Sequence, residues 1–376
     1  MDWKVSALGF GGMRLPILNN DFKNVNQLEA IRMMRYAFDH GVNYIDSAWG
    51  YHYGNSEVVI GKALQDGYRK KVRIATKLPC FEVKSYEDFD RLLNEQAKRL
   101  QTEKIDYYLL HGLNRREWPK VRDIGVIKWA EGAIADGRIG YLGFSFHDDY
   151  EVFQKIVDAY DNWTLCQIQY NYMDEGFQAG TRGLEYAHKK GLAVVVMEPI
   201  RAGRLARPPE KVAAIWANTP LKVTPQEMAL RWVWNHPEVT LALSGMSTMQ
   251  QVIEDIAYAE HSQPHNLTVD ELALIERARD VYLSLNQVAC TGCRYCMPCP
   301  NGVDIPRIFE LYNDAIIYND YRHPRWAYSV NSPGILKEEN RADKCIQCRQ
   351  CVEKCPQKLS IPDLLEKAHE FLTAKS

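Results

Sequence analysis

The chain has 376 residues, 46% of them hydrophobic and 25% charged, a composition that supports a folded core and excludes a disordered chain. Its 46 basic and 48 acidic residues nearly cancel, so no overall charge attracts nucleic acid or an anionic membrane. No apolar run approaches the roughly 20 residues needed to cross a bilayer, and the N-terminus lacks the pattern of a secretion signal. We therefore expect a cytoplasmic protein with neither nucleic-acid nor membrane partners.

Short apolar runs rich in β-forming residues alternate with longer segments of helical period. Eight runs are expected to be strands: 5–10, 42–46, 72–77, 105–110, 139–145, 165–170, 192–197 and 239–244. Eight strand–helix units favour a closed (β/α)8 TIM barrel over an open doubly wound sheet. The open sheet would need a complete G-x-G-x-x-G pattern after its first strand, whereas Gly9, Gly11 and Gly12 complete only part of it. We interpret these glycines as a tight loop at the barrel mouth.

The organisation changes after the eighth unit. Residues 268–285 are predicted to form an amphipathic helix, with Thr268 as N-cap and Glu271 completing a capping box. We place the domain boundary after this helix, giving a barrel over 1–285 and a small helical domain over 286–376. Within the second domain, C-P-N-G-V-D-I-P (299–306) and C-P-Q-K-L-S-I-P (355–362) form an internal repeat.

The C-terminal ends of three successive predicted strands carry polar residues, namely Asp46, Lys77 and His111. The carboxyl ends of barrel strands converge on one cavity, so these side chains are expected to lie together. Taken singly, each has an ordinary interpretation, as a cap, an exposed strand end or a hydrogen-bonded polar residue. Together, an acid, a base and an imidazole on three strand ends predict a catalytic site.

This arrangement resembles the aldo/keto reductase family over roughly residues 5–260. The family uses a tetrad of Asp, Tyr, Lys and His, with the tyrosine five residues after the aspartate, a position that falls on Tyr51; Tyr53 is the neighbouring alternative. The resemblance implies hydride transfer between NADH or NADPH and a small-molecule carbonyl or alcohol.

The chemistry explains why these residue types are needed. Hydride addition to a carbonyl leaves developing negative charge on oxygen, which a proton donor must neutralise. Tyr51 would be that donor, and the Lys77 ammonium is expected to lower the pKa of the phenol from its usual value of about 10. Asp46 would hold Lys77 charged, and His111 would orient the carbonyl.

The resemblance also implies a nicotinamide site. Ser145 and Gln167 match family positions that bind the carboxamide, and Met197 stands where a tyrosine often stacks on the ring. Expected contacts at the adenine end, in the turn 244–256, are Gly245, Ser247, Gln251 and Asp255. NADP-preferring members usually carry Lys or Arg in this turn for the 2′-phosphate, and its absence here favours NADH.

Three arginines follow the seventh predicted strand in the loop EPIRAGRLARPP. Arg201, Arg204 and Arg207 could clamp a pyrophosphate, or they could form one solvated face at spacings of three residues. The sequence leaves both interpretations open.

Eight of the ten cysteines lie after position 289, in two runs of four. The second run, CIQCRQCVEKCP, is the C-x2-C-x2-C-x3-C-P pattern of bacterial ferredoxins, and zinc is the alternative for such CxxC pairs. In two-cluster ferredoxins the fourth cysteine of each run ligates the other cluster. This pattern implies a [4Fe-4S] cluster held by Cys290, Cys293, Cys296 and Cys355, and a second one held by Cys299, Cys345, Cys348 and Cys351. The first run has only two residues before Cys299, which also favours the exchange.

The segment between the two runs is longer than in a minimal ferredoxin, and DIPRIFELYNDAIIY within it is predicted to be helical. The domain therefore resembles the α-helical ferredoxin-like domains of larger oxidoreductases. We expect an aldo/keto-reductase-like oxidoreductase whose two clusters provide electron transfer, with an electron-carrier protein as a candidate partner. The alternative is a non-catalytic nicotinamide-binding relay or redox sensor with structural clusters.

Overall fold

A computed structural model describes residues 3–329 and 336–374. The chain divides into two compact units, the first formed by Met1–Ala202 and Gln226–Leu267, the second by Gly203–Pro225 and Thr268–Ser376. The segment Gly203–Pro225 therefore groups with the C-terminal residues, although it lies between the seventh and eighth strands in sequence.

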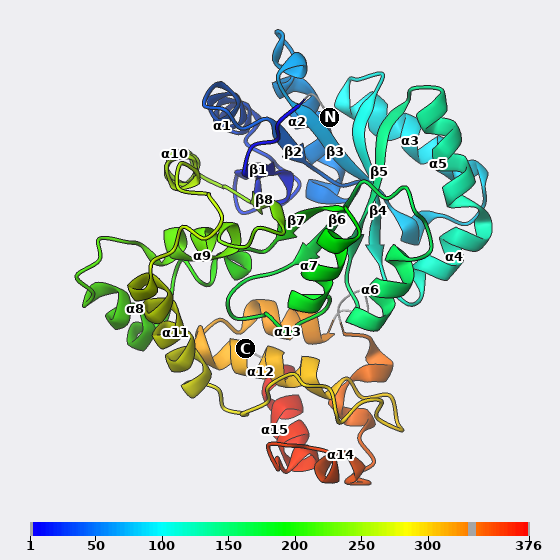
Figure 1. Cartoon of the computed structure of the whole chain (residues 1–376). Helices are drawn as coiled ribbons and strands as arrows, with labels where there is room; N and C mark the ends of the chain where they lie inside the picture. The colour runs from blue at the N-terminus through cyan, green and yellow to red at the C-terminus, as the bar shows by residue number, and fades with distance from the viewer. Residues whose placement is uncertain (1–2, 330–335, 375–376) are drawn as a thin grey trace. The chain divides into compact units, whose positions relative to one another are not determined.

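The first unit is a closed barrel of eight parallel strands in sequence order (Figure 1). The strands are β1 (Leu8–Gly11), β2 (Tyr44–Asp46), β3 (Arg73–Leu78), β4 (Ile105–Leu113), β5 (Ile139–Phe146), β6 (Leu165–Gln169), β7 (Ala193–Met197) and β8 (Val239–Ser244). Pairing of β1 with β8 closes the barrel, with Phe10 opposite Ser244. The predicted fold and all eight predicted strand positions are confirmed.

Helices surround this barrel. In the first unit they are α1 (Gln27–Asp39), α2 (Asn55–Ala63), α3 (Glu87–Leu100), α4 (Glu117–Ile124), α5 (Val126–Ala135), α6 (Tyr150–Val157), α7 (Gly180–Lys189), α9 (Pro225–Trp234) and α10 (Met249–Ala259). Short 3-10 turns include η1 (Gly12–Arg14), η2 (Tyr51–Gly54) and η4 (Cys80–Glu82). Thr248 is the N-cap of helix α10, and its side chain accepts a hydrogen bond from Gln251 N.

The barrel interior is filled by side chains. A cluster inside it comprises Tyr44, Ala75, Tyr107, Leu109, Leu165, Val195, Leu241 and Leu243. Burial of this apolar surface is the main stabilising contribution and fixes the strand ends relative to one another.

The loop after β1 is tight, as its glycines predict. A Cβ atom at Gly12 would lie 2.7 Å from Ser56 Oγ and 2.9 Å from Asp46 O. Only glycine therefore allows the β1 loop to approach β2 and α2 so closely.

The second unit is helical. It contains α8 (Glu210–Ala217), α11 (Val269–Ser284), α12 (Ile305–Ile317), α13 (Arg322–Ser329), α14 (Gln350–Glu353) and α15 (Ile361–Thr373). The capping box of Thr268 and Glu271 at the start of α11 is confirmed. Helices α12 and α15 each begin at the Ile-Pro that ends one copy of the repeated motif, and residues from both share an apolar cluster that includes Phe309 and Leu365.

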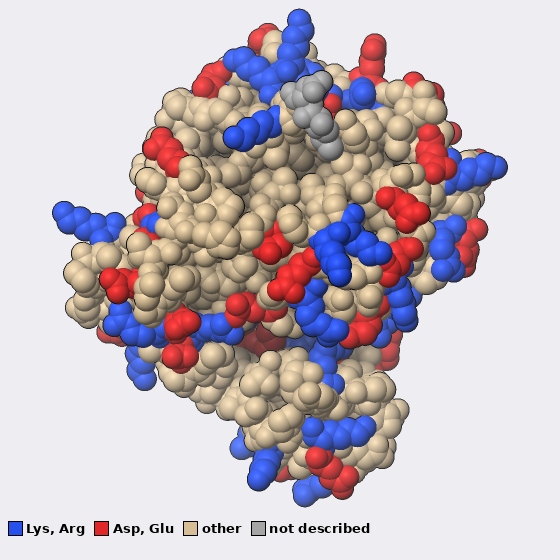
Figure 2. All heavy atoms as spheres, in the orientation of Figure 1, with Lys and Arg blue, Asp and Glu red and all other residues tan. Residues whose placement is uncertain are grey.

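Acidic and basic side chains are nearly equal in number, and on the face shown in Figure 2 they are interspersed. Within residues 3–329 and 336–374, no helix combines the length and apolar character that crossing a membrane requires.

Candidate active site and cluster-binding cavities

The structure brings the four predicted catalytic residues together at the barrel mouth. The Lys77 ammonium donates to Asp46 Oδ1 over 2.6 Å and to the Ser47 carbonyl over 2.7 Å. The same ammonium lies 5.0 Å from the centroid of the Tyr51 ring, and this ring meets the His111 imidazole edge-on at 6.3 Å. Asp46, Tyr51, Lys77 and His111 therefore form one contiguous group.

The two candidate tyrosines have different surroundings. Tyr51 is half-buried and faces Lys77 and His111, whereas Tyr53 is 71% exposed and its ring lies under the Lys23 ammonium. Only Tyr51 is placed to act with the other three residues.

His111 lies within β4 rather than after it, because the strand continues to Leu113. The pairing of β4 with β5 shifts register between Leu110 and Leu113, and Gly112 in this stretch has a φ of +65°. Such irregularities reorient side chains next to active sites. The structure thus extends the predicted strand and shows how the imidazole is turned toward Tyr51.

Burial governs the electrostatics of the tetrad. Burial alone would lower the pKa of Lys77, but Asp46 and Tyr51 more than offset it, so the pKa is raised and the ammonium is retained. Burial and the Lys77 charge hold the pKa of His111 well below its usual value, which leaves a neutral imidazole.

The pKa of Tyr51 differs from the expectation. Burial raises it above the usual phenol value, and the opposing effect of Lys77 does not overcome burial because Asp46 also acts on the phenol. Lys77 lowers the pKa of Tyr51 as the sequence predicts, but burial outweighs this effect, and the net pKa in the resting arrangement is raised. Lys77 is placed to stabilise negative charge that develops on the phenolic oxygen, rather than to ionise the phenol in advance.

The predicted carboxamide residues are both buried. Ser145 Oγ accepts a hydrogen bond from Gly112 N over 2.8 Å, and Gln167 Nε2 donates to Asp46 Oδ2 over 2.6 Å. Gln167 thus links β6 to the Asp46–Lys77 pair. Met197 is half-buried at the end of β7, against the cluster inside the barrel.

The predicted adenine-end residues gather at the start of α10. Ser247 N donates to Gln251 Oε1 over 2.8 Å, while Asp255 is buried one turn further on. Gly245 is exposed next to the loop after β1, where a Cβ atom would come within 3.0 Å of Arg14 Cγ.

Arg14 was not among the residues predicted from the sequence. The Ser247 hydroxyl donates to the Arg14 carbonyl over 2.8 Å, so this exposed arginine is tied to the turn after β8. Within the described residues, no ion pair or side-chain hydrogen bond engages its guanidinium. In the sequence, Arg14 is marked only by its place after the glycines of the first loop. Its proximity to the turn after β8 becomes apparent only in the structure, where β1 pairs with β8.

The arginines after β7 have protein partners. Arg201 Nε lies 3.2 Å from Asp174 Oδ2, and Arg204, in the second unit, pairs with Asp314 and lies over the Tyr318 ring. Their side chains are only 12% and 18% exposed. The interpretation as one solvated face is therefore wrong for these two residues.

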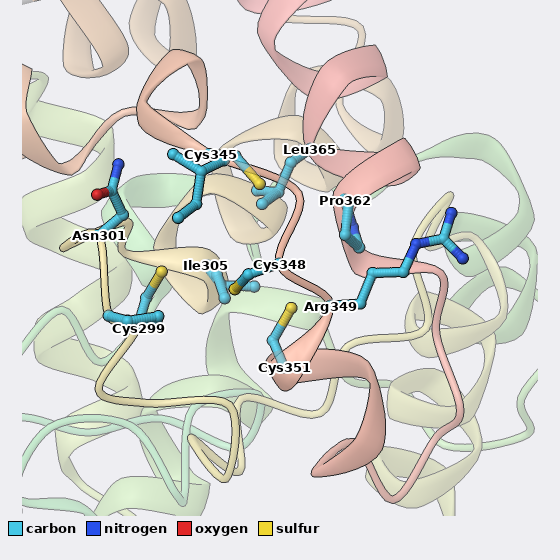
Figure 3. A pocket seen from close by; sticks show the side chains of 11 residues that line it. Cys299, Asn301, Ile305, Cys345, Cys348, Arg349, Cys351, Pro362 and Leu365 are labelled. Carbon is cyan, nitrogen blue, oxygen red and sulfur yellow. The ribbon is translucent and has the colours of Figure 1, made fainter.

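The eight clustered cysteines line two cavities in the second unit. One cavity is lined by Cys299, Cys345, Cys348 and Cys351 (Figure 3). The other is lined by Cys290, Cys293, Cys296 and Cys355. Each set combines three cysteines of one run with the fourth cysteine of the other run. Ile305, the first residue of α12, lines both cavities.

The two thiol sets match the ligand requirement of iron–sulfur clusters. Four thiols around one cavity are the ligands a [4Fe-4S] cluster requires. Across the part of the chain that the structure describes, no three His, Cys, Asp or Glu side chains are grouped so as to hold a single metal ion.

Two family sequence models match consecutive parts of the chain. The sequence model of the aldo/keto reductase family matches residues 7–280, and that of the 4Fe-4S dicluster domain matches residues 289–360.

Individual relatives resemble the barrel. A Glycine max protein described as probable aldo-keto reductase 1 is 31% identical over 38% of this chain and 42% of its own length. L-galactose dehydrogenase of Arabidopsis thaliana is 25% identical over 73% of this chain and 90% of its own length.

Solved structures show the same fold. An aldo-keto reductase from Bacillus halodurans in its holo form is 26% identical, covers 74% of this chain and 93% of its own, and has a TM-score of 0.60. An aldo/keto reductase from Klebsiella pneumoniae in complex with NADP and acetate is 24% identical, covers 73% of this chain and 91% of its own, and has a TM-score of 0.60.

Asp255 predicts a pH-dependent stability. Burial raises the pKa of its carboxyl to about 6, and its Oδ2 atom has no hydrogen-bond partner among the described residues. The folded state therefore holds this proton more tightly than the unfolded state, and stability falls as pH rises from about 4 to about 6. Asp255→Asn is expected to increase the free energy of unfolding at pH 8 by about 1–3 kcal/mol.

Denaturant unfolding at pH 8 and pH 5 measures this effect, and the gain should be smaller at pH 5. Glu276→Gln, on an exposed side chain of helix α11, is the control and should show no such gain. An equal gain from Asp255→Asn at both pH values would contradict the assignment.

Proposed function

Because the chain belongs to the aldo/keto reductase family, we propose that its barrel interconverts a small-molecule carbonyl and alcohol with NADPH, while its cysteine-rich domain carries electrons. The observation that supports the reaction is the grouping of Asp46, Lys77, Tyr51 and His111 at the barrel mouth, with Asp46 and Lys77 buried. A bound reduced nicotinamide would supply the hydride.

The tetrad residues have separate roles in this proposal. Tyr51 donates its phenolic proton to the carbonyl oxygen as the hydride arrives at carbon, so that the alcohol and a phenolate are formed. Lys77 stabilises the phenolate, and Asp46 keeps Lys77 charged and fixed. His111 is neutral and is therefore suited to hydrogen-bond the substrate oxygen.

Arg14 supports NADPH rather than NADH. The turn after β8 contains no cation of its own, which favoured NADH on sequence alone. Arg14 is exposed, the aliphatic part of its side chain lies against Gly245, and its carbonyl is bonded to Ser247, two residues before the first residue of α10. Loops after the last strands of a (β/α)8 barrel commonly hold phosphate groups, and arginine binds phosphate through two parallel hydrogen bonds.

The domain boundary and the cluster count are also proposals. We place the boundary after α11, at residue 285, between the residues matched by the two family models, although α11 itself belongs to the second compact unit. The two cavities, each with four cysteines, support two [4Fe-4S] clusters. Because a nicotinamide delivers two electrons as hydride and a cluster accepts one, we propose that the clusters exchange electrons with an external carrier protein.

The tetrad proposal is tested with Tyr51→Phe. This change removes the proton donor, and we expect carbonyl reduction to fall by at least about 100-fold while NADPH binding is retained. Steady-state kinetics over a panel of aldehydes and ketones, together with fluorescence titration of NADPH, measures both quantities.

Tyr53→Phe is the matched control and should retain full turnover, since this side chain faces solvent. Equal turnover in Tyr51→Phe and the parent protein would overturn the proposed reaction and favour a nicotinamide-binding relay or sensor.

The cofactor proposal is tested with Arg14→Ala. Loss of the guanidinium should raise KM for NADPH about tenfold or more while leaving KM for NADH unchanged. Arg32→Ala, on the exposed surface of α1, serves as the control. Equal effects on the two cofactors would show that Arg14 does not contact the 2′-phosphate.

The exchange of fourth cysteines is tested by two double variants. Cys299→Ser/Cys345→Ser removes two ligands of one proposed cluster, so about half of the iron should remain after anaerobic purification. Cys299→Ser/Cys290→Ser removes one ligand from each cluster and should lose nearly all of it. The opposite pattern would mean that each run binds its own cluster.

A further inference from the structure

We propose that Glu57 is a positioning residue that fixes Lys77 and the Tyr51 loop relative to each other through Gln96, Thr76 and Arg99. The inference rests on the proposed function, since it concerns the residues that hold the tetrad in place. Glu57 itself is not part of the tetrad.

Glu57 is a buried acid near the start of α2. Its side chain is fully buried, and its Oε1 atom accepts hydrogen bonds from Thr76 Oγ1 over 2.6 Å and from Gln96 Nε2 over 2.7 Å. Its Oε2 atom lies 3.3 Å from Arg99 Nη1, forming an ion pair. A carboxylate in this position is stabilised only because three donors compensate for its lost hydration.

One side of this network reaches the strand that carries the catalytic lysine. Thr76 directly precedes Lys77, and Gln96 Nε2 also donates to the Lys77 carbonyl over 3.0 Å. Gln96 Oε1 accepts from the Tyr108 hydroxyl over 2.7 Å, which ties the network to β4, three residues before His111.

The other side reaches the loop that carries the proton donor. Arg99 Nη1 donates to the Trp49 carbonyl over 3.3 Å, and its guanidinium lies 3.9 Å from the Trp49 ring centroid. Trp49 lies between Asp46 and Tyr51 in sequence. A single carboxylate therefore connects the backbone on both sides of the Lys77–Tyr51 contact.

The close fit around α2 supports this role. A Cβ atom at Gly54 would lie 3.0 Å from Arg99 Nη1, and one at Gly61 would lie 2.7 Å from the Arg99 carbonyl. Glycines thus allow α2 and α3 to approach closely enough for Glu57 to reach Arg99. The alternative is that Glu57 serves the stability of the barrel and has no effect on turnover.

Glu57→Gln separates these roles. The amide has nearly the same shape, but it removes the charge that pairs with Arg99 and places an N–H donor where the carboxylate accepted. We expect kcat to fall by about tenfold to a hundredfold, because a small misplacement of reacting groups typically costs a factor of about this size. KM and the dissociation constant for NADPH should change less than about twofold, because the cofactor residues do not depend on this network.

Asp106→Asn is the matched control. Asp106 is also a buried barrel acid with charged partners, Arg69 and Arg73, and it accepts from Ile74 N, but it lies at the opposite end of β4 from His111. Both variants should lower the melting temperature, and only Glu57→Gln should lower kcat.

The outcomes are distinct. Parental kcat in Glu57→Gln, or an equal loss in Asp106→Asn, would overturn the positioning role. If Glu57→Gln does not fold, Thr76→Val removes a single donor of the network and should still lower kcat with KM unchanged. Retained turnover in Tyr51→Phe would instead overturn the proposed function, whatever Glu57→Gln shows.

Discussion

The buried ion pair of Lys77 and Asp46 is the interaction on which the proposed active site depends. Lys77 is 1% exposed, and an isolated ammonium at such a position would lose its proton. It is retained because Asp46 and the Ser47 carbonyl accept its hydrogen bonds, while Gln167 donates to the other oxygen of Asp46. The pair thus joins the neighbouring strands β2 and β3, and Gln167 connects it to β6, which is distant from both in the strand order.

Much of this arrangement could be predicted from the sequence, because it follows from local patterns. Apolar periodicity located all eight strands, and polar residues at strand ends identified Asp46, Lys77 and His111. The spacing of the cysteine runs also anticipated how their fourth members are exchanged between the two cavities.

The remaining features depend on contacts between distant segments. Arg14 meets the turn at Gly245 only through the β1–β8 pairing, some 230 residues apart in sequence. The pKa of Tyr51 could not be predicted because burial and Asp46, which raise it, oppose Lys77, which lowers it. Segment 203–225 lies between the seventh and eighth strands, as an ordinary barrel connection would. It nevertheless groups with the C-terminal unit, where Arg204 pairs with Asp314.

Removing the buried ion pair without leaving an unpaired charge is the most direct test of its role in catalysis. The double variant Asp46→Asn/Lys77→Met replaces both charges by neutral side chains of similar size, so the barrel should still fold and bind NADPH. We predict that single-turnover reduction of a carbonyl substrate slows by at least about 100-fold, because nothing then stabilises the developing phenolate. Parental rates in a correctly folded double variant would contradict the account.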